Sequence, residues 1–208
     1  MAYPEFYSQV PRLLLRDPLA EFLGALDDGL VKFSYVEAVK VAGHSCPTVA
    51  SAYLMTAKAL AGLYGNEMPE RGAVRVSFAA DQEQGVTGVI ALVVATLTGA
   101  AGPGGFKGIG GRFDRRELLR FGVPELDGQA RFERMQGGGA LDATLHLDRV
   151  PADPELHPLL QKYAAGRATP EEAERFRALW QGRVKAILVD HWDDPAILTL
   201  VPARVRNG

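Results

Sequence analysis

The chain has 208 residues, and its 23 Lys and Arg residues against 25 Asp and Glu residues give a formal net charge of −2 at pH 7. This balance excludes the strongly basic surface that neutralises nucleic-acid phosphates, so we expect no nucleic-acid partner. Hydrophobic residues make up 47% of the chain, which is ordinary for a globular domain and excludes wholesale disorder. The single cysteine, Cys46, excludes an intrachain disulfide.

Membrane and export signals are weak in this sequence. The most apolar stretch, residues 86–97, is short and is interrupted by threonine and glycine, so we expect no membrane span. The first seven residues lack the basic and apolar regions of a signal peptide. We therefore expect a cytoplasmic protein.

Four helices are predicted before residue 99. The first 33 residues are expected to form a helical lead-in, in which Asp17 caps a short helix that starts at a proline. A capping-box pair predicts a helix from Ser34 to Gly43. A proline start, a long apolar run and a glycine stop predict the next helix over residues 47–65, and residues 86–98 are apolar almost all round, which indicates a buried helix.

Strands are predicted around a glycine-rich loop at residues 99–111. Alternating apolar and polar residues indicate strands at 74–78, 130–135 and 141–147. The three glycines at 137–139 fit a hairpin turn between the last two strands.

The C-terminal part of the chain changes character after residue 150. Three prolines give a linker-like stretch, and an amphipathic helix is predicted over residues 170–190. Its apolar stripe either docks on the core of the same chain or forms the seam of a homodimer. We therefore divide the chain into an α+β domain at 1–150, including the lead-in, and a helical extension at 151–208 for dimerisation or docking.

The candidate chemical site is Gly-His-Ser-Cys-Pro at residues 43–47. Cys46 lies at the start of an apolar helix, where unpaired backbone N–H groups and the helix dipole favour a thiolate. His44 is close enough in the chain to bind the same ion, and zinc suits a thiolate with an imidazole. The alternative from spacing alone is a buried cysteine beside a core histidine.

Residues 43–47, followed by Ala50 and Tyr53, resemble the FmdE-like family of formylmethanofuran dehydrogenase components, whose pattern is Gly-His-x-Cys-Pro-Gly-Leu-Ala-x-Gly-Tyr-Arg. A second match runs from Gly-Val at 85–86 to Leu-Thr-Gly at 97–99, so the resemblance covers residues 34–147. It implies an α+β fold with helices packed on one face of a mixed or antiparallel sheet, and often a homodimer. It also implies a metal, commonly zinc, held by the residues matching His44 and Cys46.

This chain departs from the family pattern at several positions. Thr48 and Ala52 replace family glycines, and Gln84 stands where many members have a further cysteine. The C-terminal zinc ribbon of some members is missing. The chain therefore represents a divergent branch, to which formylmethanofuran chemistry is not carried over. We expect Tyr53 and Gln84 to contact a ligand near the metal.

Positive charge gathers at the glycine-rich loop, with Lys107 inside it and Arg112 directly after it. Exposed N–H groups in such a loop bind carboxylate or phosphate. Either the glycines serve a tight connection, or the loop is an anion-binding wall that faces His44 and Cys46. No Gly-Lys-Ser/Thr motif occurs, which excludes a Walker A loop.

These features lead to a functional expectation with two alternatives. We expect a zinc-binding protein that binds or processes a small anionic ligand at the His-x-Cys site. The first alternative is haem binding through the Cys46-Pro47 pair. The second is a non-catalytic accessory subunit that uses its C-terminal helix against a partner. Enzymatic activity is left open, since no catalytic triad, dinucleotide motif or diagnostic carboxylate pair is recognisable.

Overall fold

The computed structural model describes residues 3–203, which fold into six α-helices, a five-stranded sheet and a two-stranded sheet. This arrangement confirms the α+β fold class. The elements in chain order are η1 (Glu5–Gln9), β1 (Leu13–Arg16), α1 (Pro18–Phe22), β2 (Leu30–Phe33), α2 (Tyr35–Ala42), α3 (Pro47–Tyr64), β3 (Val74–Phe78), α4 (Thr87–Thr98), β4 (Leu119–Arg120), β5 (Ala130–Arg134), β6 (Ala140–Leu145), η2 (Leu147–Arg149), α5 (Leu156–Ala164), α6 (Pro170–Lys185), η3 (Ala186–Asp190) and β7 (Leu198–Pro202).

The larger sheet has the strand order β4-β3-β5-β6-β7, and β4 pairs parallel with β3 while the other pairs are antiparallel. The predicted alternation in β3 is confirmed, because Val74, Val76 and Phe78 are buried. The opposite face is polar: Arg75 on β3 pairs with Glu133 on β5, the residue beside it in the register. The sheet therefore presents one apolar face to the helices.

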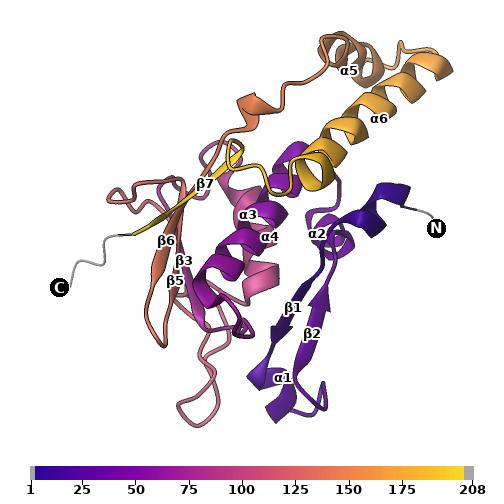
Figure 1. Ribbon diagram of the computed structural model, residues 1–208. Helices are drawn as coiled ribbons and strands as arrows, with labels where there is room; N and C mark the ends of the chain where they lie inside the picture. Colours follow the sequence, from indigo (N-terminus) through magenta and orange to yellow (C-terminus); the bar gives the residue numbers. More distant parts are fainter. Residues whose placement is uncertain (1–2, 204–208) are drawn as a thin grey trace.

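Helices α3 and α4 form the middle layer of the molecule. Figure 1 shows them between the five-stranded sheet and the β1–β2 hairpin. Most residues of α3 are buried, including Tyr53, Leu54 and Met55, because the helix has neighbours on all sides. The core of the protein is centred on this helix.

The N-terminal segment is not the helical lead-in expected from its sequence. Within it, α1 spans five residues, and β1 and β2 pair antiparallel on either side of it. Leu13 and Leu15 alternate with exposed neighbours, which is a strand pattern, and β2 provides the partner strand. The prediction that Asp17 caps α1 is confirmed, since its carboxylate accepts the N–H groups of Leu19 and Ala20.

Helix α4 is less buried than its apolar sequence indicates. Leu92 is 44% exposed, and Gly88, Ala95 and Thr96 on the same face of the helix are only partly buried. The prediction of a helix buried all round is therefore wrong for one face. None of the helices in residues 3–203 combines the length and the apolar character that a bilayer crossing requires.

The C-terminal segment forms a helical hairpin, α5 with α6, that projects from the body of the molecule in Figure 1. The C-terminal end of the predicted amphipathic helix packs into the chain's own core through Val184, Ile187 and Leu188. Its last turn, η3, is a π-helix. The chain then returns as β7, which pairs with β6, so the segment predicted as an extension also completes the sheet. The homodimer seam stays a prediction.

Candidate functional site

The first candidate site is the start of α3. Cys46 is the N-cap residue of this helix, and its Sγ accepts a hydrogen bond from the backbone N–H of Val49 at 3.5 Å. The thiol is 8% exposed and belongs to the hydrophobic core cluster. The predicted position at the helix start is confirmed, and the sulfur satisfies one of the N–H groups that a helix start leaves free.

The imidazole of His44 is exposed and contacts its own loop. Its Nδ1 lies 2.9 Å from the carbonyl oxygen of Ala42, so we assign the proton to Nδ1 and the lone pair to Nε2. Metal-binding histidines commonly donate their second ring N–H to a carbonyl in this way. The orientation of His44 therefore leaves one nitrogen free for a ligand in solvent.

The loop between α2 and α3 is held in place by α6. The indole N–H of Trp180 donates to the Ser45 carbonyl at 2.8 Å, and the Ser45 hydroxyl donates to the Gln181 amide oxygen at 3.2 Å. The hydroxyl of Tyr35 lies 3.0 Å from the Ser45 oxygen, and burial raises the pKa of this tyrosine. These contacts from α6 and α2 fix the loop next to Cys46.

A complete metal site does not form from the residues that the structure describes. No group of three or more His, Cys, Asp or Glu side chains in residues 3–203 is arranged to hold an ion. A structural zinc ion takes four ligands. His44 and Cys46 would thus supply two of them, and the others would have to come from water, a bound molecule or another chain.

Tyr53 lies within the core and away from solvent. Its side chain is fully buried, and its hydroxyl donates to the carbonyl oxygens of Pro11 at 2.9 Å and Phe33 at 3.3 Å. These two carbonyls belong to the segments that begin β1 and end β2. In this structure the tyrosine joins the β1–β2 hairpin to α3.

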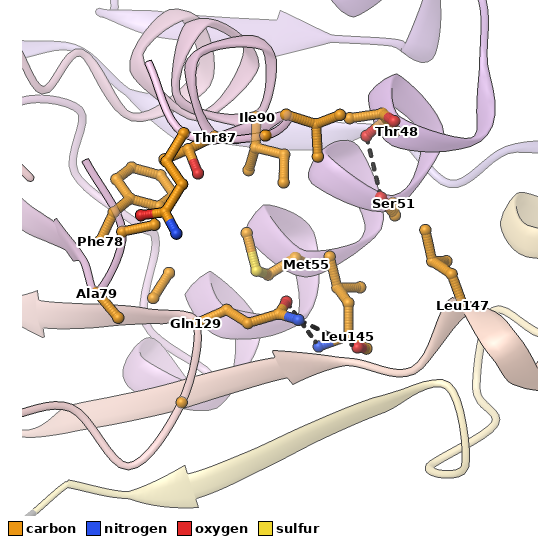
Figure 2. Close-up of a pocket in the computed structure, with 16 residues that line it drawn as sticks. Thr48, Ser51, Met55, Phe78, Ala79, Thr87, Ile90, Gln129, Leu145 and Leu147 are labelled. Carbon is orange, nitrogen blue, oxygen red and sulfur yellow. Dashed lines mark hydrogen bonds between the residues drawn. The ribbon is translucent and has the colours of Figure 1, made fainter. Parts of the chain in front are cut away.

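Gln84 lies at a different place, in the lining of a pocket of about 450 Å³ between the helices and the sheet. We call it the apolar pocket. Figure 2 shows side chains from both helices on one side of it and Gln129 and Leu145 from the sheet side on the other. Its lining residues are Thr48, Ser51, Met55, Phe78, Ala79, Ala80, Gln84, Gly85, Val86, Thr87, Ile90, Gly128, Gln129, Ala130, Leu145 and Leu147.

The apolar pocket has neutral polar groups at defined positions. The Gln129 amide is bonded to the backbone N–H and carbonyl of Leu145, and the Ser51 hydroxyl donates to the carbonyl of Thr48. The Thr87 hydroxyl has no hydrogen-bond partner within residues 3–203. Among residues 3–203, no side chain with a carboxylate, ammonium, guanidinium, imidazole or thiol group lines the pocket.

The starts of two helices lie at the apolar pocket. Thr48 belongs to the first turn of α3, and Thr87 to the first turn of α4. The N-cap residue of α4 is Val86, whose side chain makes no capping hydrogen bond. Both helix dipoles thus place their positive ends at this pocket, which favours oxygen acceptors there.

The glycine-rich loop lies at the other end of these helices. Arg112 lines a second pocket that Arg71 also lines, and the Arg71 guanidinium donates to the carbonyl of Thr96 in the last turn of α4. The 12 residues of α4 separate the two ends by about 18 Å. The structure therefore does not bring Lys107 and Arg112 together with His44 and Cys46.

No protein-family model matches the chain, and no curated protein matches it. The resemblance to the FmdE-like family thus stays a prediction. Sequence reasoning missed the apolar pocket because its lining comes from five separate stretches of chain. One signal was present: the hydroxyls of Thr48, Ser51 and Thr87 stand near the starts of two otherwise apolar helices.

Proposed function

We propose that this protein binds a small molecule in the apolar pocket. The observation that carries the proposal is a cavity of about 450 Å³ with an apolar lining and, at the starts of two helices, the hydroxyls of Thr48 and Thr87, neither of which has a hydrogen-bond partner within residues 3–203. Ligand sites in proteins commonly have this size, an apolar wall and a few placed polar groups. The proposal keeps the expected small-molecule partner and places it beside, and not at, the His-x-Cys loop.

The ligand we propose has an apolar body and an oxygen acceptor, either a carboxylate or a carbonyl group. Met55, Phe78 and Ile90 would pack against the body. The acceptor would accept a hydrogen bond from the Thr87 hydroxyl at the positive end of the α4 dipole. Because no charged side chain lines the pocket in residues 3–203, the proposed role is binding, and no catalytic step is assigned.

Two-dimensional amide NMR of the protein tests this proposal by titration with a panel of small aliphatic and aromatic carboxylic acids and their matching alcohols. We expect acids of fitting size to bind and to shift amide signals around residues 84–90 and 128–130. The Thr87→Val change keeps the side-chain shape and removes the hydroxyl, so it should weaken acid binding by about fivefold to tenfold.

The matched control is Thr96→Val on the same helix. The Thr96 hydroxyl donates to the carbonyl of Leu92, and Thr96 is not among the residues that line the apolar pocket. Affinity should stay within about twofold of the wild type in this variant. Equal losses in the two variants, or no binding across the panel, would rule out the proposed site.

A zinc ion at His44 and Cys46 is the second candidate, and the observation that favours it is the free Nε2 of His44. Zinc in this position would polarise a bound oxygen or organise the loop. Metal analysis of the purified protein should give about one zinc per chain, and His44→Ala and Cys46→Ser should both abolish it. His157→Ala, which removes another exposed histidine, is the control. Zinc retained by both site variants would exclude the candidate.

The sequence also suggested two other functions, haem binding and an accessory role, and each makes its own testable prediction. Haem binding predicts a Soret band that disappears in Cys46→Ser, although a thiol that is 8% exposed offers little access to iron. An accessory role predicts a partner for the projecting α5–α6 hairpin. Neither alternative has a specific contact in the structure that favours it over the apolar pocket.

A further inference from the structure

The C-terminal end of α4 carries a cluster of arginines around one carboxylate. Asp17 is 4% exposed, and its carboxylate accepts from Arg71 at 2.8 Å and from Arg115 at 2.6 Å. Two guanidinium groups thus share a single negative charge. The Nε of Arg71 is a buried donor without an acceptor in residues 3–203.

Glycines make room for these two arginines. Gly99, which ends α4 with a φ of 74°, would place a side-chain Cβ 3.0 Å from Arg71 and 3.1 Å from Arg115. Gly72 has a φ of 86°, and a Cβ there would lie 3.1 Å from Arg115. The Arg115 guanidinium and the Arg71 stem therefore lie against bare backbone at these two positions, which explains why both are glycine.

A third arginine, Arg112, is positioned by aromatic rings. Its guanidinium carbon lies 4.6 Å from the ring centre of Phe113 and 5.9 Å from that of Phe22. Phe113 has a φ of 64°, a conformation that favours glycine. Arg112 makes no ion pair with any carboxylate in the part of the chain from residue 3 to residue 203.

These groups surround a pocket of about 560 Å³, which we call the arginine pocket. Four arginines line it, together with two acidic residues. When the carboxylates that pair with these arginines and the arginine that pairs with Asp114 are included, the pocket and its surroundings contain five arginines and four carboxylates. The charged residues in this account are Arg16, Arg71, Arg112, Arg115, Arg116, Asp17, Glu21, Glu70 and Asp114.

We propose that the arginine pocket binds an oxyanion, a phosphate or carboxylate group of a small molecule, with Arg112 as its main cation. Among the arginines that line this pocket, Arg112 is the one without an ion-pair partner in residues 3–203, and guanidinium groups match the geometry of both oxyanions. The exposed ring of Phe22, which contacts the Phe113 ring in the pocket lining, offers an apolar surface for the rest of such a ligand. This site is separate from the apolar pocket and does not depend on it.

Titration of the whole protein with inorganic phosphate, pyrophosphate and citrate tests the proposal in a low-salt buffer free of these ions. Two-dimensional amide NMR should show shifts centred on residues 111–115 and 71–72. Comparing the affinities for phosphate and pyrophosphate with the affinity for citrate shows whether the pocket prefers phosphate or carboxylate groups. We expect Arg112→Gln to weaken the tighter of them by about tenfold.

The matched control is Arg120→Gln, which removes the same charge eight residues away. Arg120 does not line the arginine pocket and pairs with no carboxylate in residues 3–203, so its loss should change affinity by no more than about twofold. Both arginines are exposed, so both variants should fold. Equal weakening in the two variants would show a general charge effect and overturn the proposal. So would unchanged affinity in Arg112→Gln, or no shifts at 111–115 with any of the three anions.

Discussion

Replacing Asp17 with asparagine tests the charge arrangement beneath the arginine pocket. An asparagine keeps one side-chain oxygen, which still caps α1 by accepting from Leu19 and Ala20. It loses the negative charge and one acceptor, so Arg71 and Arg115 remain close together without a counter-ion. The variant thus separates the charge of this residue from its capping role.

The size of the effect follows from the two contacts that change. A hydrogen bond between charged groups contributes about 1.5–3 kcal/mol, and two of them are weakened. The side chains of Arg71 and Arg115 are 21% and 12% exposed, so water recovers part of the loss. We therefore expect the free energy of unfolding to fall by about 3 kcal/mol at pH 7. In a chain of this length the melting temperature should fall by about 6–12 °C.

The effect should depend on pH. Burial by itself raises the pKa of Asp17, but the hydrogen bonds from Arg71 and Arg115 outweigh it and hold the pKa below its usual value. A carboxyl group with a lowered pKa in the folded state stabilises the protein above its unfolded pKa of about 3.9. This contribution is lost as the pH falls through the folded value. The difference between wild type and Asp17→Asn should therefore narrow below about pH 4.

Urea unfolding of both proteins at pH 7 and at pH 3 measures this difference directly. The reasoning is refuted by a loss at pH 7 of less than about 1 kcal/mol, because that would place the two ion pairs in effectively bulk water. A difference that stays the same at pH 3 would also refute it, since the charge would then not be its source.

Two further changes test local packing. Trp180→Phe removes the indole N–H that the Ser45 carbonyl accepts, so stability should fall by about 1 kcal/mol and amide hydrogen exchange should accelerate in residues 43–47. Unchanged exchange would mean that α6 does not hold this loop. Gly105→Ala would place a Cβ 2.5 Å from the Cβ of Ala101 and should lower the free energy of unfolding by about 1–3 kcal/mol. Gly104→Ala meets no atom within 4 Å and is the control; equal losses would point to backbone entropy instead of the clash.

The helix boundaries were predictable because their signals are local. Ser34 with Glu37 and Thr169 with Glu172 form the two capping boxes, and the structure contains both. Each box satisfies backbone N–H groups within a single turn, so it needs no knowledge of the rest of the fold. The fold class was predictable for a similar reason, since β3 and β6 alternate over their own short lengths.

The missed strands depend on partners far away in the chain. β7 begins at Leu198 and pairs with β6, more than fifty residues earlier, and its outer face is exposed. β1 and β2 are four residues each and have apolar residues on both faces, so their composition did not separate a strand from a helix. These segments are strands because they pair with β6 or with each other, and such pairing is not visible in the spacing of apolar residues.

The location of the glycine-rich loop was equally beyond the sequence. The pattern of glycines and cations indicated backbone that approaches a ligand closely, and Gly99, the first residue of the loop, does lie close to Arg115. The sequence did not show which distant residues the loop would contact in the folded chain. One of the two interpretations of the loop placed it opposite His44 and Cys46, whereas Arg115, just after the loop, pairs with the carboxylate of Asp17.

The polarity of the two central helices accounts for the chemistry at each end of the molecule. α3 and α4 both begin at the apolar pocket, where their dipoles favour oxygen acceptors and where Thr87 offers a free hydroxyl. Cations gather at the other ends: Arg71 donates to a carbonyl in the last turn of α4, and Arg134 lies 4.2 Å from the ring centre of Tyr64, the last residue of α3. A helix end with free carbonyls favours positive charge, and those cations in turn attract oxyanions. The two proposed sites thus follow from one structural feature, the shared direction of α3 and α4.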